Sequence, residues 1–178
     1  MFLHNLLQIQ KVHLLENISL ILFNPIMFRH SINDLVFIEF AINDRYNDIP
    51  EEQTKQNIEY MINSVYENNP YADIVFVLVT DKNVIGTEFK TLKTIKSVAE
   101  YYGLPTVDVG QAMWEELKGS TDNWDEYYSD SVHPSDKGHK VYANTVFEKM
   151  EEIIKIPIDY NFKTQKEHHP PDGVLFLL

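Results

Sequence analysis

The stretch DLVFIEFAIND, residues 34–44, decides the fold of this chain. Its middle part, Leu35 to Phe40, is a short apolar run that contains a single charged residue, Glu39. Such a run is typical of a β-strand that is covered on both faces. A polar loop follows directly, from Asn43 to Pro50. A buried strand that ends in polar side chains predicts a parallel sheet with a ligand site beyond the carboxyl end of the strand.

Two further apolar runs lie downstream and alternate with helical segments. DIVFVLV at residues 73–79 predicts a second buried strand, and residues 105–109 predict a shorter third one. Helices are expected at residues 51–69, 87–102, 110–118 and 135–154, and an acidic, aromatic loop at 119–132. Strands that alternate with helices in this way imply parallel pairing, with helices on both faces of the sheet.

Composition excludes several classes of function. The chain has 178 residues, no cysteine, and a formal net charge of −12 from 15 basic and 27 acidic side chains. The length fits one globular domain, and the absence of cysteine excludes a disulfide scaffold and a thiolate metal site. An acidic surface repels phosphate backbones, so nucleic acid is not an expected partner. No apolar run reaches the roughly 18 residues of a membrane span.

No cofactor and no metal are expected either. No strand is followed by the glycine-rich loop that a flavin- or phosphate-binding module would need. The pair His168-His169 near the C-terminus lacks a second pair of ligands at a matching spacing.

One chemical signal is the pentapeptide Asp130-Ser131-Val132-His133-Pro134, which comes just before the last expected helix. An Asp three residues before a His can fold back and accept the imidazole Nδ1–H, which leaves Nε2 free to act as a base. The alternative interpretation is a helix-entry loop with an incidental hydrogen bond between Asp130 and His133.

A second signal is Asn43, which follows the first predicted strand. Its amide can reach the ligand region and stabilise a developing oxyanion. The alternative is an ordinary turn made by Asn43 and Asp44. Because both signals fall at the same edge of the expected sheet, their combination favours a catalytic site.

Together, DLVFIEFAIND and DSVHPSDKGH resemble the third and the last conserved blocks of the SGNH (GDSL-type) hydrolases. The resemblance implies a three-layer α/β/α sandwich with a flavodoxin-like parallel sheet. It also implies hydrolysis of an acyl ester or of an O-acetyl group on carbohydrate, by a serine nucleophile without a cofactor. By position, His133 would be the general base, Asp130 its orienting partner and Asn43 one oxyanion donor. Ala41 stands where the family has a glycine.

The family's nucleophile block, Gly-Asp-Ser, has no counterpart before Asn43, because the first glycine of the chain is Gly86. The two serines of that region are poor candidates. Ser19 lies inside an apolar run, and Ser31 lies at the amino end of the first predicted strand. We therefore expect very little hydrolytic activity from this chain. The alternative function is an acyl- or carbohydrate-binding pseudo-hydrolase, or a truncated fragment.

Three further serines lie near His133 in sequence. Ser129 and Ser131 flank Asp130 and are expected to point away from Nε2, and Ser135 is expected to cap the last helix. Glu39 would need a partner if it is buried, and Arg45 is the candidate for a structural ion pair.

We divide the chain into an atypical apolar segment at residues 1–33, a hydrolase core at 34–156 and a tail at 157–178. Residues 3–15 could form a helix, 18–23 a strand and 174–178 an edge strand. Without the family's first strand, we expect the sheet to be incomplete at its N-terminus and to offer an edge for oligomer formation. The start of the chain shows no signal peptide, so a cytoplasmic location follows if Met1 is the true start.

Overall fold

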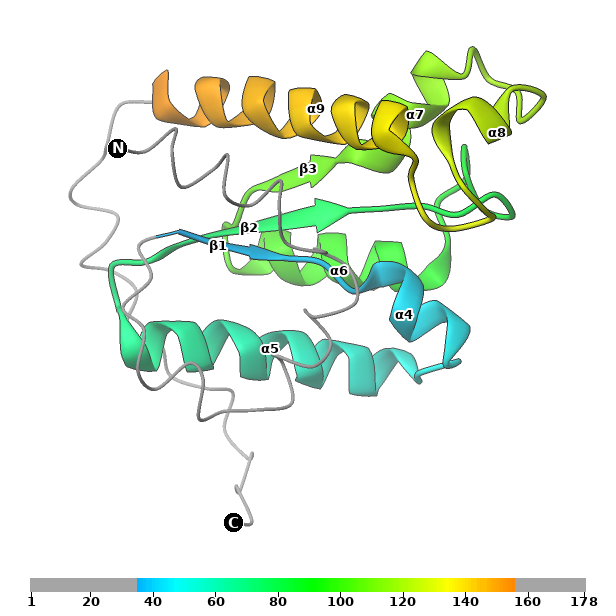
Figure 1. The fold of residues 1–178 in the computed structure, drawn as a ribbon. Coiled ribbons are helices and arrows are strands. Elements are labelled where there is room, and N and C mark those ends of the chain that lie inside the picture. The colour runs from blue at the N-terminus through cyan, green and yellow to red at the C-terminus, as the bar shows by residue number, and fades with distance from the viewer. Residues whose placement is uncertain (1–34, 156–178) are drawn as a thin grey trace.

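A computed structural model describes residues 35–155 as a three-layer α/β/α fold (Figure 1). Its centre is a parallel three-stranded sheet in the order β1-β2-β3, made of β1 (Leu35–Ile38), β2 (Asp73–Leu78) and β3 (Thr106–Asp108). Leu35 pairs with Asp73, and Phe76 pairs with Thr106. All three strands therefore end at one edge of the sheet.

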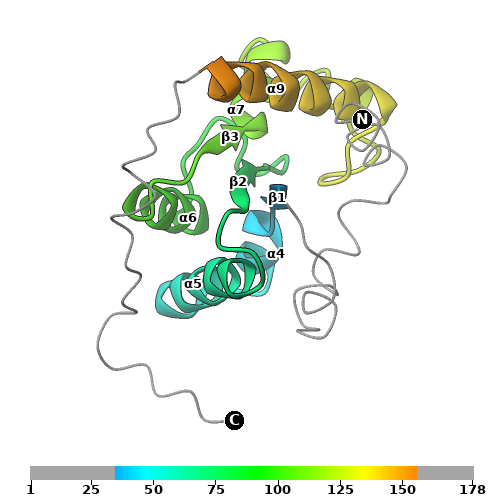
Figure 2. The ribbon, with the colours of Figure 1, turned by 90° about the vertical axis from the view of Figure 1, so that its left-hand side faces the viewer.

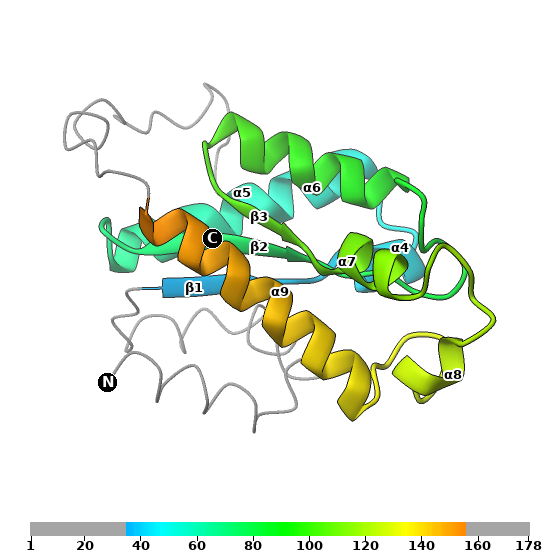
Figure 3. The same ribbon diagram turned by 90° about the horizontal axis from the view of Figure 1, so that it is seen from above.

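Helices cover both faces of this sheet (Figure 2). One layer contains α4 (Ala41–Tyr46), α5 (Glu51–Asn68) and α6 (Lys90–Tyr101), and the other contains α7 (Val109–Glu116), α8 (Trp124–Tyr127) and α9 (Asp136–Lys155). Seen from above, α9 runs diagonally across the sheet (Figure 3). This arrangement confirms the predicted fold class.

The core is divided by the two-residue period of β2. Ile74, Phe76 and Leu78 belong to the apolar cluster packed with α5 and α6, whereas Val75 and Val79 belong to the cluster that includes Met150 of α9. Successive side chains of a strand point to opposite faces, so an unbroken apolar run is what a strand between two helical layers requires.

The three strands and four helices predicted within residues 35–155 are all present, with small shifts at their ends. The polar loop expected from Asn43 to Pro50 was wrong in its first part, because residues 41–46 form α4. Ala41 and Ile42 are buried, and the backbone N–H of Asp44 donates to the carbonyl of Phe40. The loop expected at residues 119–132 contains the short helix α8, whose Trp124 and Tyr127 are buried.

Some predictions lie outside residues 35–155 and are not described by the structure: the helix at 3–15, the strand at 18–23, the edge strand at 174–178 and the incomplete N-terminal side of the sheet. Within residues 35–155, no helix combines the length and the apolar character that crossing a membrane would take.

The first turn of α9 lies against the α8 segment at Gly138. A Cβ atom there would overlap the backbone carbonyl oxygen of Tyr127, which also accepts the N–H of Ser135. The nearest atoms are backbone atoms of Tyr127 and the ring carbon Cβ of Pro134, so no flexible side chain could move aside. Gly138 therefore permits the close approach that joins α9 to the segment before it.

Gly138→Ala should destabilise the protein by about 1–3 kcal/mol, because overlap with a backbone carbonyl exceeds the gain from the better helix former. Urea unfolding followed by circular dichroism measures this difference. Asn144→Ala, on the exposed side of the same helix, serves as the control and should change stability by less than about 0.5 kcal/mol. Equal stability of the two variants would show that the approach at Gly138 imposes no constraint.

Candidate active site

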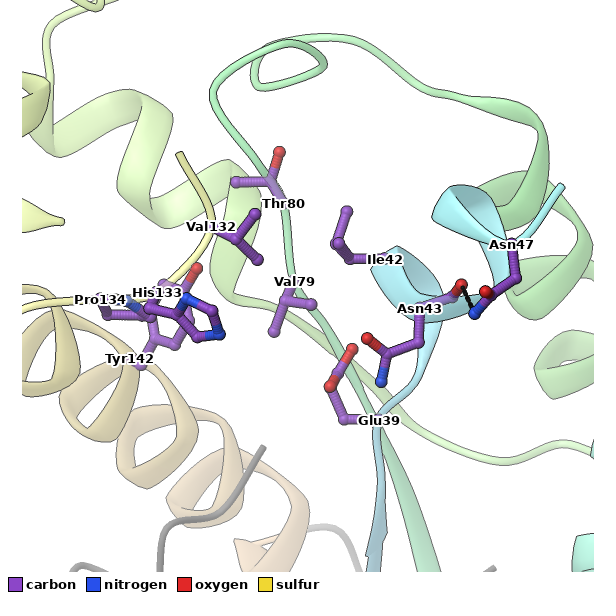
Figure 4. Close-up of a pocket in the computed structure, with 10 residues that line it drawn as sticks. All are labelled: Glu39, Ile42, Asn43, Asn47, Val79, Thr80, Val132, His133, Pro134 and Tyr142. Atoms are coloured by element: carbon purple, nitrogen blue, oxygen red, sulfur yellow. Dashed lines mark hydrogen bonds between the residues drawn. The ribbon is translucent and has the colours of Figure 1, made fainter. Parts of the chain in front are cut away.

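A cavity of about 360 Å³ lies at the carboxyl edge of the sheet (Figure 4). It is formed where the segment after β1, the end of β2 and the turn before α9 meet. Its lining residues are Glu39, Ile42, Asn43, Asn47, Val79, Thr80, Val132, His133, Pro134 and Tyr142. The cavity thus brings together Asn43 and His133, which the sequence separates by 90 positions.

His133 is held by Asp130 through the contact that the sequence predicts. Nδ1 of His133 lies 2.7 Å from Oδ2 of Asp130. The other carboxylate oxygen, Oδ1, accepts the backbone N–H groups of Val132 and His133, each at 2.7 Å. The turn therefore uses both oxygens of one carboxylate, and it leaves Nε2 as the nitrogen of His133 that is free for chemistry.

These hydrogen bonds change the acidity of Asp130. The backbone N–H of His133, its imidazole and the backbone N–H of Val132 together lower the pKa of Asp130 to about 2. The carboxylate is therefore ionised at neutral pH and acts only as an acceptor. An ionised carboxylate at Nδ1 favours the tautomer that carries its proton on Nδ1.

An aromatic stack of Trp124 and Tyr128 packs against the Asp130–His133 turn. The indole Nε1–H of the buried Trp124 donates to the backbone carbonyl of Asp130 at 2.6 Å. The Trp124 ring stacks on Tyr128 with centroids 3.7 Å apart, and the Tyr128 and Tyr142 hydroxyl oxygens are 2.6 Å apart. Trp124, Tyr127 and Tyr128 do not line the cavity, so these aromatic side chains pack against the turn and do not form a wall of the site.

Asn43 lies in the first turn of α4, on the side of the cavity opposite His133 (Figure 4). Its backbone carbonyl accepts the side-chain amide of Asn47 at 2.8 Å. Burial of Ala41 and Ile42 anchors this turn against the sheet. The position of Asn43 is therefore fixed by a helix, and the ordinary turn weighed as the alternative is not formed.

Glu39 is buried directly after β1, but the prediction that Arg45 is its partner was wrong. Arg45 pairs with the buried Asp81 at 2.6 Å instead. Oε1 of the Glu39 carboxyl group accepts the backbone N–H of Ala41 at 3.1 Å. Burial raises the pKa of Glu39 to about 8, so the group carries a proton at neutral pH.

No serine among residues 35–155 lines the cavity. The Ser129 hydroxyl donates to the carbonyl of His133, and the Ser135 hydroxyl donates to the carbonyl of Glu126 and accepts the N–H of Gly138. The last contact is the helix cap expected at Ser135. Ser19 and Ser31 lie outside the described residues.

The described residues also hold no cluster of three or more acidic or histidine side chains arranged around a metal position. The chemistry that residues 35–155 offer is therefore that of an oriented imidazole, an amide donor and a neutral carboxyl group around one cavity.

The family model for the GDSL-like lipase/acylhydrolase family matches residues 8–141. The chain belongs to this family of hydrolases. The match begins within the N-terminal segment and includes Asn43, Asp130 and His133.

Solved structures share the fold at low sequence identity. Protein YXIM from Bacillus subtilis matches with a TM-score of 0.61 and 15% identity over 80% of this chain and 42% of that one. A putative GDSL-like lipase from Parabacteroides merdae matches with a TM-score of 0.58 and 16% identity over 82% and 68%. A peptidoglycan O-acetylesterase matches with a TM-score of 0.52 and 20% identity over 68% and 38%.

The chain therefore spans less than half the length of two of these structures. No curated protein matches its sequence.

Asp130 should remain ionised until the pH falls to about 2, whereas an ordinary Asp is half protonated near 3.8. In His133→Ala the imidazole bond is lost, but two backbone N–H groups remain, so the pKa should rise and stay below the ordinary value. A carboxyl ¹³C titration measures both values. The stabilisation from these bonds should be complete above about pH 4 and disappear as the pH falls towards 2. Identical titrations in both proteins would contradict the contribution of the imidazole.

Trp124→Phe should keep the aromatic stack but remove the indole bond to Asp130, at a cost of about 1 kcal/mol. The Asp130–His133 turn should then loosen, and the fraction of His133 with its proton on Nδ1 should decrease. Imidazole ¹⁵N shifts report this fraction. Trp114→Phe is the matched control, since Trp114 packs against the same cluster and beside Gly86 but makes no hydrogen bond to the turn among the described residues. An unchanged tautomer in Trp124→Phe would exclude support of the turn by the indole.

Proposed function

We propose that the cavity binds the acyl group of a carboxylic ester and that the chain acts in acyl ester hydrolysis, including the removal of O-acetyl groups from carbohydrate. One observation carries this proposal: an imidazole oriented by a carboxylate lies across one cavity from an amide donor. Membership of the GDSL-like family and the fold shared with a peptidoglycan O-acetylesterase support it.

In this proposal Asp130 holds the Nδ1–H of His133, so the lone pair on Nε2 accepts the proton of an attacking hydroxyl group. General base catalysis of this kind contributes about 10²–10⁴-fold to a rate. The Asn43 side-chain N–H donates to the oxygen of the ester carbonyl as it becomes negative, a contribution of about 3–4 kcal/mol in comparable sites. His133 then returns the proton to the leaving alcohol.

The nucleophile is the part of this mechanism that we do not assign. The sequence has no Gly-Asp-Ser, and the serines at 129 and 135 donate to backbone carbonyls. We therefore infer slow turnover by this chain. The same observations favour a second candidate function, the binding of an acyl or carbohydrate ligand in this cavity without turnover.

Hydrolysis of p-nitrophenyl acetate by the full chain should be weak and should change less than about threefold in His133→Ala, because a base without a nucleophile contributes little. Release of nitrophenolate measures the rate. His139→Ala, an exposed position on α9, is the control for the loss of a histidine. A rate that falls more than about 100-fold only in His133→Ala would contradict this prediction and would show that His133 activates a nucleophile at this site.

Binding tests the cavity itself, independently of turnover. A methyl glycoside with one O-acetyl group should shift the NMR signals of the His133 ring and the Asn43 amide, and the same glycoside without the acetyl group should not. Asn43→Ala should weaken binding about tenfold, the value of one lost hydrogen bond. Equal binding of both glycosides, or binding that leaves these two signals unchanged, would refute the proposed function.

A further inference from the structure

Glu39 is the carboxyl group of the cavity that the hydrolytic mechanism does not use. Only 8% of its surface is exposed, and it lies directly after the apolar strand β1. Burial of a charged group costs free energy unless the charge is paired. A role in stability alone would be met better by an apolar side chain of similar volume.

The hydrogen bonds of this carboxyl group are incomplete within the protein. One oxygen, Oε1, accepts the backbone N–H of Ala41. Within residues 35–155, no other hydrogen bond or ion pair reaches Glu39, and Arg45 is committed to Asp81. Among the described residues, every fully buried side-chain oxygen has a hydrogen-bond partner. The second oxygen of Glu39 has none among these residues, so it is not fully buried. Because Glu39 lines the cavity, this oxygen is exposed to the cavity.

The orientation of the Glu39 side chain agrees with an oxygen that is exposed to the cavity. Figure 4 shows the Glu39 carboxyl group turned into the cavity, between Val79 and the side chain of Asn43. It therefore lies on the side where an ester carbonyl would meet the Asn43 amide. A polar group of a ligand at this position would be within reach of both side chains.

The surroundings of Glu39 favour its neutral form. Burial and the negative charge of Asp44 raise its pKa to about 8, against the effect of the Ala41 N–H. Tyr142 faces it from α9 and His133 from the preceding turn, and burial raises the pKa of Tyr142 well above the usual value, so that phenol is neutral. A neutral carboxyl group has one O–H donor in addition to its acceptor capacity.

We propose that Glu39 is a ligand-binding residue whose cavity-facing oxygen carries a proton and donates a hydrogen bond to an oxygen of a bound carboxylic ester or carboxylate. No covalent step is involved. With the Asn43 amide, Glu39 provides a second donor for the acyl group. The proposal deepens the proposed function and rests on it for the position of the acyl group.

The affinity of this site for a carboxylate should depend on pH. When Glu39 loses its proton, its donor becomes an acceptor with a negative charge, and a carboxylate ligand is then repelled. Affinity for a carboxylate should therefore fall as the pH rises through about 8. In Glu39→Gln the amide N–H donates at every pH, so this loss should not occur.

Acetate is the probe, and its binding is followed by NMR on the full chain from about pH 7 to about pH 9.5. The affinity of the wild type should fall about tenfold more than that of Glu39→Gln across this range. Glu39→Leu should bind acetate about tenfold more weakly than the wild type at the lower pH. Glu52→Gln, an exposed change on α5, is the control and should behave as the wild type.

A measurement on the wild type alone covers the case in which a variant does not fold. Because acetate prefers the protonated form, saturating acetate should raise the midpoint of the Glu39 carboxyl ¹³C titration. An unchanged midpoint, or the same pH dependence in wild type and Glu39→Gln, would overturn the proposal.

The two proposals fail differently. If acetate shifts the signals of Asn43 and His133 but leaves the Glu39 midpoint unchanged, the acyl site stands and Glu39 is not part of it. If acetate shifts none of the three, both the acyl site and the role of Glu39 are refuted.

Discussion

The parallel pairing of β2 with both of its neighbours is the constraint on which the rest of the structure depends. Because β1, β2 and β3 run in one direction, the segments that follow them emerge at one edge of the sheet. The apolar side chains of β2 alternate between two helical layers and fix its register. Glu39 and Thr80 come to the same cavity for this reason, although 40 residues separate them in the sequence.

The two sides of the cavity have separate supports. Asn43 and Glu39 depend on the sheet, through the burial of Ala41 and Ile42. His133 depends on the Asp130 carboxylate and on the Trp124–Tyr128 stack beneath it. The two supports meet where Val132, Tyr142 and Val146 pack into the cluster of Ile42 and Val79. Helix α9 therefore sets the distance between His133 and Asn43, and a change in this packing would alter the cavity without touching a polar group.

The sequence predicts the three strands, the four long helices and the hydrogen bond between Asp130 and His133, because each depends on short-range patterns. Helix α4 was not predicted, because Asn43, Asp44 and Asn47 are residues typical of a turn. The burial of Ala41 and Ile42 decides the conformation of this segment instead. The ion pair between Arg45 and Asp81 was not predicted either, since Asp81 is distant in sequence and only the fold brings the two side chains together. For the same reason the sequence could not show that Glu39 opens into the cavity.

The central claim is that one acyl group lies between His133 and Asn43. Intermolecular NOEs from the methyl protons of a bound O-acetyl glycoside test this claim most directly. An NOE requires two protons within about 5 Å of each other, and a cavity of about 360 Å³ is small enough for one methyl group to lie near both side chains. We expect NOEs from the same methyl group to the His133 ring and to the Asn43 side-chain amide. NOEs to only one of them, or to residues outside the cavity, would contradict it.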